Sequence, residues 1–557
     1  MLFKMKNAAI LFIFLLTSCT TSIKETVNVP FSEKIDYKEY SPNESDIIIS
    51  RSNYYDKLYG FWLGQCIANW TGLSTENDKI GNVGGSKSGD FYTRKDWGGV
   101  SSRTEKKIDF VFKEADEIWG ADDDTDIEYM YQFLTSQNSN ILTPKTIQEG
   151  WLKYIKHEEQ NYLWVSNQKA FDLMKNGVFP PETGSLELNE FYEMIDAQLT
   201  TEIFGLFSPT REDFALKLSH LPIRTTAREN AAWISEFYVT MHSLASSVDQ
   251  TLNMKDQIMW IAEKSRVVLP KDSYASKMYD FVKEKYNSKI PWEQARDSVY
   301  YRYQVNQEDG YDITSKNFGC NGCFAAGINF AASLVSLFYG EGDYKETIKI
   351  GTLCGWDSDN PTSTWGGLIG FMIGKDKIEE IFDRKFSNSY NIHRTRQNFP
   401  NNGIDTFENM SLQGIHIIDR IIQSDLEGGV DKVNDLGVIA VDEHHELHGA
   451  ETDHDEYHNP LFHIDDEGYI HIRDLSTYTK KDDYDTPTRI LAGESFDKIA
   501  PEGLHLMENL HHHRNDLIAL IANHPSDTLE GGIVYQYEFD TSLIKDPDFL
   551  ITEGDRK

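Results

Sequence analysis

The sequence predicts a mainly α-helical protein with a smaller C-terminal region that contains β-structure. Ile127, Met130, Tyr131 and Leu134 recur at i, i+3, i+4 and i+7, which is the spacing of one helix face. Beyond about Ser424 the chain becomes rich in acidic residues and histidine, with short alternating runs that are typical of strands. The clearest alternating runs are Tyr469–Ile472 and Ile533–Tyr537. The 557 residues exceed the about 250–300 at which a single core stops growing, so we expect a large core and a further region.

The N-terminus has the pattern of an export signal. Lys4 and Lys6 precede an apolar run over residues 8–16, which is well short of the about 18 apolar residues that a membrane span needs. The adjoining Leu16-Thr17-Ser18-Cys19 resembles a bacterial lipobox, and the resemblance implies cleavage before Cys19 and attachment of a lipid to it. An ordinary signal with an incidental cysteine is the alternative.

From this pattern we expect an exported bacterial lipoprotein, located in the periplasm or at the cell surface on the outer membrane. Residues 1–18 would be the signal peptide, and residues 19–50, which are polar and lack periodicity, would be a tether. The lipid on Cys19 would then be the only contact of the protein with the membrane.

The composition excludes one class of partner. The formal net charge is −35, yet 39% of the residues are hydrophobic and 12% are aromatic, which is typical of a folded protein rather than a disordered one. A chain so acidic, without a basic stripe, repels nucleic acid, so we expect no nucleic-acid partner.

The first helical pattern begins at Asp56 and has small residues on one face. Gly60, Gly64 and Ala68 follow one another at intervals of four, which predicts close approach of another backbone. The Gly-rich stretch over residues 81–99 indicates a long loop, a common place for ligand contacts. Further along, the apolar segment over residues 323–338 is too short for a membrane span and predicts a helix buried on all sides.

Two acidic clusters each precede a helical pattern. Asp122-Asp123-Asp124-Thr125-Asp126 stands before the first, and Asp357-Ser358-Asp359-Asn360 stands before the second. One acidic residue suffices to cap a helix, whereas consecutive carboxylates repel each other. Carboxylate oxygens are the ligands of hard cations such as Mg²⁺. The clusters therefore predict a cation site if the fold brings them together, and plain helix capping is the alternative.

Three motifs together resemble the ADP-ribosylglycohydrolase family. The stretch from Gly60 to Glu76 is similar to the family's opening Gly-rich helix, in which a catalytic glutamate follows the last glycine by four residues. Asp122–Thr125 and Gly355–Asn360 are similar to its two metal-binding motifs. The family consists of all-α hydrolases with a paired magnesium or manganese centre. The resemblance therefore implies an orthogonal helical bundle over residues 51–424 and leaves residues 425–557, the acidic, His-rich region, without a known function.

The resemblance also implies roles for individual residues. Two Mg²⁺ ions, or Mn²⁺ in their place, are the implied cofactors, and Glu76 matches the catalytic carboxylate. The implied metal ligands are Asp122, Asp123, Asp124, Asp357, Asp359 and Asn360. Two of these depart from the family pattern, because Asp122 stands where a threonine or serine is usual and Asn360 where threonine is usual. Asn69 also stands where the opening motif often has aspartate.

The cysteines and histidines offer a weaker signal. Cys320 and Cys323 form a single CxxC pair, without the second pair that a four-cysteine zinc site needs. A local disulfide and buried free thiols are both compatible with this spacing. The histidines that gather after residue 440 lack the spacing of a helical zinc motif, and we expect them to be ordinary exposed side chains.

We therefore expect a metal-dependent glycoside hydrolase that cleaves an N- or O-glycosidic bond to ADP-ribose or another furanose. The substrate would be a small molecule, an ADP-ribosyl conjugate or a glycan. A glycosidase acting on a furanose-containing glycan is one alternative, and a non-catalytic sugar-binding lipoprotein is another. In a binding protein Glu76 need not face the clusters, and in a protein with separate calcium-stabilised loops the two clusters would lie far apart.

Overall fold

The computed structural model describes residues 29–440, except 39, 44, 82–89, 158–160 and 313–321, and three later strands. The described residues form fourteen α-helices and three small sheets, so the predicted mainly α-helical class is confirmed. The helices are α1 Arg51–Gly72, α2 Asp123–Gln137, α3 Pro144–Tyr154, α4 Val165–Lys175, α5 Ile203–Phe207, α6 Glu212–Arg224, α7 Glu229–Leu244, α8 Met254–Ser265, α9 Tyr274–Asn287, α10 Trp292–Val299, α11 Ala326–Gly340, α12 Tyr344–Cys354, α13 Asp359–Phe382 and α14 Phe407–Ser424.

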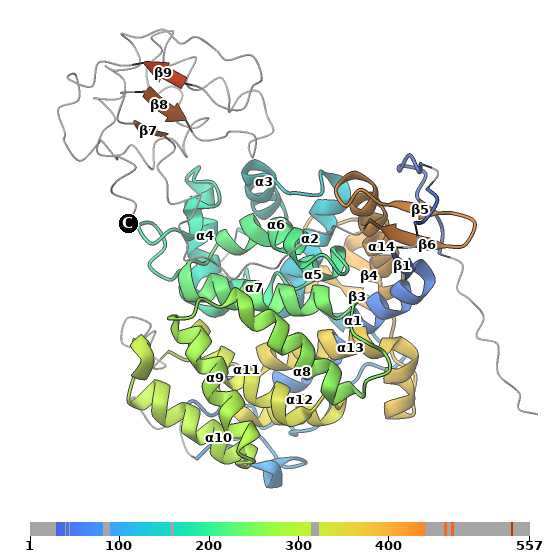
Figure 1. Cartoon of the computed structure of the whole chain (residues 1–557). Helices are drawn as coiled ribbons and strands as arrows, with labels where there is room; N and C mark the ends of the chain where they lie inside the picture. Colours follow the sequence, from blue (N-terminus) through green and yellow to red (C-terminus); the bar gives the residue numbers. More distant parts are fainter. Residues whose placement is uncertain are drawn as a thin grey trace, which may run out of the picture.

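Helices α1 and α13 lie side by side in the middle of the molecule (Figure 1) and form its most extensive helix pair. They run antiparallel, and glycines line both sides of the contact. A Cβ atom on Gly64 would lie 2.4 Å from the carbonyl oxygen of Gly366, and one on Gly60 would lie 2.3 Å from that of Gly370. The close backbone approach predicted for this face of α1 is therefore confirmed, and its partner is α13.

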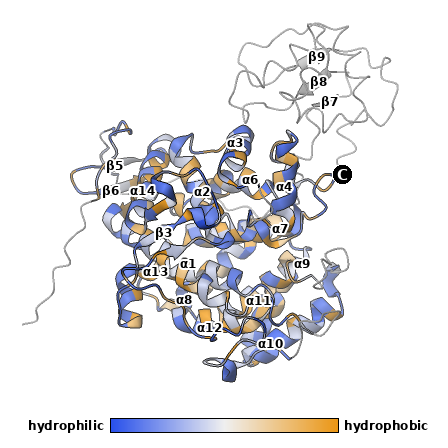
Figure 2. Ribbon diagram, turned by 180° about the vertical axis from the view of Figure 1, so that it is seen from behind, coloured by the Kyte–Doolittle hydropathy of each residue, from blue (hydrophilic) through white to orange (hydrophobic). Residues whose placement is uncertain are grey.

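The surrounding helices bury apolar faces against this pair. Helix α11 is buried over almost its whole length, as predicted for its apolar segment. Outer helices such as α9 and α10 instead carry both hydrophobic and hydrophilic residues (Figure 2), as amphipathic helices do. None of the described helices is both long and apolar enough to cross a membrane.

Two small sheets tie distant parts of the chain together. Strand β1 Ile47–Ser50 pairs antiparallel with β6 Leu436–Ile439, which also pairs with β5 Gly429–Asp431. The expected tether is described from Val29 onward, and there it packs on the helical body: Val29 is buried, and the Tyr37 hydroxyl donates to Asp419 of α14 at 2.8 Å. The second sheet joins β2 Trp119–Gly120, β3 Ser389–Asn391 and β4 Ile404–Thr406.

The predicted C-terminal β-structure is present. Strands β7 Phe462–Ile464, β8 Tyr469–Ile472 and β9 Gln536–Glu538 form a third sheet, in which β8 pairs with both neighbours. Strand β8 coincides with the alternating run predicted there, and β9 overlaps the second run by two residues. Most histidines after residue 440 lie outside the described residues.

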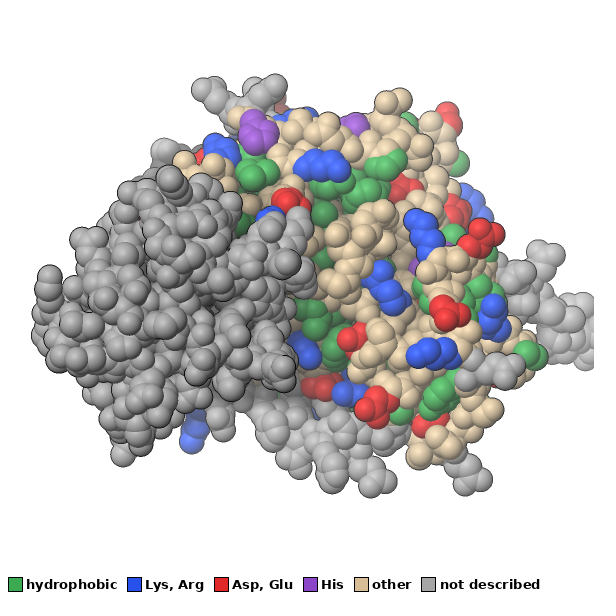
Figure 3. Space-filling model, turned by 90° about the horizontal axis from the view of Figure 1, so that it is seen from above, with side chains coloured by type: hydrophobic (Ala, Val, Ile, Leu, Met, Phe, Trp, Pro, Cys, Tyr) green, Lys and Arg blue, Asp and Glu red, His purple; other side chains and the backbone are tan. Residues whose placement is uncertain are grey.

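On the face seen in Figure 3, Lys and Arg side chains are interspersed with Asp and Glu side chains over the coloured part of the surface.

The described cysteines are of two kinds. Cys66 and Cys354 are free and buried, whereas Cys323 is disulfide-bonded. Cys320, the other member of its CxxC pair, lies outside the described residues.

Candidate metal centre

The end of α1 is built against the start of α13. At Gly72, the last residue of α1, a Cβ atom would lie 2.5 Å from the Cα atom of Asp359, so only glycine fits there. The Thr75 hydroxyl donates to the carbonyl of Thr352 at 2.6 Å and lies 2.9 Å from the Ser358 hydroxyl. These contacts hold the loop after α1, and with it Glu76, beside the second acidic cluster.

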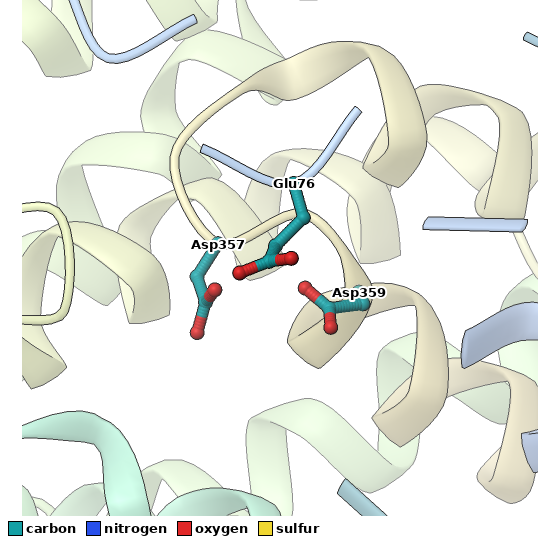
Figure 4. A group of neighbouring side chains, drawn as sticks. All are labelled: Glu76, Asp357 and Asp359. Atoms are coloured by element: carbon teal, nitrogen blue, oxygen red, sulfur yellow. The ribbon is translucent and has the colours of Figure 1, made fainter. Parts of the chain in front are cut away.

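The turn before α13 orients the second cluster. Gly355 and Trp356 both have positive φ angles, 99° and 55°, and the Trp356 indole donates to the Gln304 side chain at 2.7 Å. The backbone N–H of Asp357 donates to the Asn329 side chain at 3.1 Å. Figure 4 shows the carboxylates of Glu76, Asp357 and Asp359 directed toward one another, and one oxygen of each lies within 4.8 Å of the others.

The first cluster is a second group of the same kind. Asp122 is the N-cap residue of α2, and one oxygen from each of Asp122, Asp123 and Asp124 lies within 4.8 Å of the others. Strand β2 fixes the position of this cluster. Its pairing with β3 continues with a hydrogen bond from the Ala121 N–H to the Asn391 carbonyl at 3.2 Å, directly before Asp122.

Amide side chains connect the first cluster to its neighbours. The Asn69 amide donates to Asp124 at 2.9 Å, and the Asn360 amide lies 3.5 Å from the other oxygen of Asp124. Asn360, which the sequence places among the ligands, is fully buried behind the cavity and accepts a bond from Gln198 at 3.3 Å. Its position beside Asp124 therefore supports that residue from α13.

Two arginines near the short 3-10 helix η8 Ile392–Arg394 hold carboxylates of α2. Arg394 pairs with Asp122 at 2.9 Å, and its guanidinium lies 5.0 Å from the ring centre of Trp70. Arg396 pairs with Asp126 at 2.7 Å, and both side chains are fully buried. One oxygen of Asp122 is thus engaged by a cation of the protein, whereas the resemblance implies a neutral threonine or serine at this position.

Both clusters line one cavity of about 200 Å³. Its acidic wall contains Glu76 and five of the six predicted ligands, all except Asn360. The rest of the lining is largely apolar and aromatic: Leu73, Tyr162, Trp164, Val165, Ile195, Leu199 and Phe324. The two clusters therefore lie together, as a shared site requires and as separate calcium-stabilised loops do not predict.

The electrostatics of the cavity fit a hard cation. Burial raises the pKa of Asp123, Asp124, Asp357 and Asp359 well above the ordinary value, and the neighbouring carboxylates raise these pKa values further. Glu76 contributes to this effect on three of them, all except Asp124. Among the described residues, the buried Oδ1 atom of Asp359 has no hydrogen-bond partner. Crowded, partly unsatisfied carboxylates are a donor set that suits Mg²⁺ or Mn²⁺.

Sequence reasoning missed two charged residues of the cavity. Asp196 lies in its wall and accepts from the Ser166 hydroxyl at 2.6 Å, which fixes the start of α4 next to Trp164. Burial raises the pKa of Asp196 to about 6. The other is Arg394. The one signal for it was the extra charge at Asp122, which requires a compensating cation if it is buried.

Comparison with known proteins supports the family suggested by the motifs. A family model described as ADP-ribosylglycohydrolase matches residues 50–395, more than half of the chain. No curated protein matches the chain. A solved structure titled "ADP-ribosylglycohydrolase-related protein complex" is similar at 13% identity, covering 66% of this chain and 98% of that chain. The TM-score of this likeness is 0.37.

Proposed function

Because the chain belongs to the ADP-ribosylglycohydrolase family, we propose that it is a metal-dependent glycoside hydrolase that cleaves an N- or O-glycosidic bond to ADP-ribose or another furanose. Membership indicates a glycohydrolase. The observation that carries the finer proposal is the convergence of Glu76 and both aspartate clusters on one cavity.

The residues that would hold two ions are Asp123 and Asp124 from α2, together with Asp357 and Asp359 from the start of α13. Asp122 lies beside them and is compensated by Arg394. Magnesium or manganese bound there would supply Lewis-acid charge stabilisation and a template for vicinal hydroxyls of the sugar.

The chain's own groups supply the rest of the chemistry. Glycosidic cleavage passes through an oxocarbenium-like state. It needs a carboxyl group that donates a proton to the leaving atom when protonated, or accepts one from the attacking water when ionised. Glu76 is only half-buried and lines the cavity, so its carboxyl oxygens are placed for that transfer. The other carboxylates that line the cavity stabilise the positive charge that develops on the sugar ring.

The aromatic wall orients the substrate. The side chain of Trp164 is 57% exposed at the edge of the cavity, and a large apolar surface there excludes water from the bound sugar and restricts its orientation. A furanose-containing glycan is the second candidate substrate, and the sequence at the N-terminus that resembles an export signal favours it.

The test is a release assay with purified protein on ADP-ribosylated peptides and a panel of furanosides, with and without a chelator. We expect Mg²⁺-dependent release of the sugar and a loss of at least a hundredfold in Asp123→Ala, since this change removes a ligand. Asp280→Asn, which alters only a surface ion pair with Arg266, is the matched control. Release that is indifferent to the chelator would overturn the proposal.

We also propose that the protein is exported and lipid-anchored through Cys19, with a helical domain over residues 51–424 followed by the region 425–557. The lipobox-like sequence supports the anchor, and residues 1–28 lie outside the described residues. Metabolic labelling with a fatty acid should mark the wild-type chain and not Cys19→Ala. Labelling of both chains, or of neither, would contradict the anchor.

A further inference from the structure

Two layers of polar side chains lie four residues apart along α1, α2, α13 and the segment 198–202. We call the first the site layer: Asn69 of α1, Asp124 of α2, Gln198 of the 3-10 helix η3 Ile195–Leu199, and Asn360 of α13. Its hydrogen bonds run from Asn69 to Asp124 and from Gln198 to Asn360, which also lies beside Asp124. Through Asp124 this layer borders the cavity.

The second layer lies four residues away along the chain, and we call it the support layer: Gln65, Glu128, Thr364 and Glu202, the last being the N-cap residue of α5. Gln65 donates to Glu128, and the Thr364 hydroxyl donates to Glu202 at 2.8 Å. Glu128 and Glu202 lie together, because the backbone N–H of Ile203, the residue after Glu202, donates to Glu128. Each carboxyl group affects the pKa of the other. The support layer therefore links all three helices of the metal centre behind its ligands.

The two glutamates are buried, at 0% and 2% exposure, and their other donors are neutral. Ile203 donates its backbone N–H to Glu128 at 2.8 Å, and Thr201 donates its own to Glu202 at 3.2 Å. A hydrogen bond between two carboxyl groups requires that one of them carries a proton. Burial of two adjacent negative charges would be far more costly than burial of one.

We propose that Glu128 and Glu202 share a single proton and act as positioning residues, which keep α1, α2 and α13 in the register that the metal ligands require. Their positioning role rests on the proposed metal-dependent function. Neither residue touches the cavity, so their effect on the site passes through Asn69, Asp124 and Asn360.

The shared proton gives the pair a characteristic pH dependence. Burial raises the pKa of Glu128 well above its ordinary value and that of Glu202 to about 7. A carboxyl with a raised folded-state pKa stabilises the fold fully below its unfolded pKa of 4.5, and this stabilisation is lost as the pH rises through the folded-state pKa. Other titratable groups that interact with Glu202 are Asp124 and Tyr238, and both are kept unchanged in the test.

The experiment compares Glu128→Gln with wild-type protein in urea unfolding of the metal-free full chain between pH 5 and 9. The glutamine amide replaces the shared proton as a donor and does not ionise. We expect the wild-type unfolding constant to rise with pH more steeply than that of Glu128→Gln, by up to tenfold per pH unit. The control is Glu379→Gln, which changes a buried carboxyl of α13 that pairs with Lys385. The pH dependence of its unfolding constant should stay close to that of wild type. Identical pH profiles of wild type and Glu128→Gln would overturn the shared proton.

A second measurement tests the positioning role. Titration with Mn²⁺ alone should give a dissociation constant for Glu128→Gln within about twofold of wild type, and one about tenfold higher for Thr364→Val, which removes a donor to Glu202 without changing the side-chain volume much. Unchanged Mn²⁺ affinity in Thr364→Val would overturn the positioning role. If wild-type protein binds no Mn²⁺, the metal proposal and this positioning role both fail, while the unfolding profiles still decide the shared proton.

Discussion

At the scale of single residues, the unusual Asp122 is accompanied by its own counter-ion. Asp122 is 5% exposed, and burial raises its pKa while Arg394 lowers it. A buried carboxylate without a partner is strongly unfavourable, whereas removal of both partners is often tolerated. The pair therefore explains how an aspartate replaces a neutral side chain at this position.

Loss of Arg394 should destabilise the protein, and loss of both partners should restore it. We expect Arg394→Met to lower the free energy of unfolding by about 2 kcal/mol, less than for a fully buried pair because Arg394 is one-third exposed. The double change Arg394→Met with Asp122→Ser should recover most of that loss. Urea unfolding at neutral pH measures both, and a double variant as unstable as Arg394→Met would argue against charge compensation.

At Asp359 the charge that would bind a metal ion also lowers the stability of the metal-free protein. Its carboxylate is repelled by Glu76 and Asp124, so Asp359→Asn should stabilise the metal-free protein by about 1 kcal/mol. The wild type should gain about 2.7 kcal/mol from an ion at a hundredfold excess over its dissociation constant, and the variant should not. Thermal unfolding with Mn²⁺ or with chelator measures these changes, with Asp280→Asn as the control. An equal response of Asp359→Asn and wild type to Mn²⁺ would show that Asp359 is not a ligand.

At the scale of elements, the contact of α1 with α13 decides where Glu76 lies. The two backbones approach so closely that a methyl group on Gly64 would overlap the Gly366 carbonyl. Since Gly72 packs in the same way on Asp359, any change in the spacing of the two helices moves Glu76 relative to the second cluster.

Gly64→Ala should therefore be severely destabilising. We expect a loss of about 3 kcal/mol, because the new atom meets backbone that has little room to shift. Asn53→Ala, on an exposed position of the same helix, should cost about 0.5 kcal/mol or less. Thermal unfolding of the two variants gives the comparison, and similar stability would contradict the tight packing inferred for this pair.

The elements that carry local signals could be predicted from sequence. The small-residue face of α1, the apolar α11 and the two acidic helix starts all have a periodicity or a composition that points to their role. Strand β1 was not predicted, because Ile47–Ser50 becomes a strand only by pairing with β6, almost 390 residues later. Gln198, Glu202 and Arg394 were missed for the same reason, since only the tertiary fold brings them to the site.

At the scale of the whole molecule, strand pairing joins segments of the described chain that are far apart in sequence. Strand β6 returns to β1 next to the start of α1, and β3 returns to β2 next to the start of α2. The second of these sheets places Arg394 beside Asp122, and the remaining carboxylates come from the loop after α1 and from the turn and first residue of α13. The two acidic clusters of the candidate centre are thus 236 residues apart at Asp124 and Asn360, which explains why they had to be predicted as separate motifs.

The central claim is that both aspartate clusters form one centre for two ions. Mn²⁺ titration of the metal-free protein, followed by electron paramagnetic resonance, tests it most directly. We predict two bound Mn²⁺ per chain with a spin-coupled spectrum, because the clusters share one cavity of about 200 Å³, and a loss of that spectrum in Asp124→Asn. Absence of Mn²⁺ binding, or two ions with uncoupled spectra, would contradict the claim.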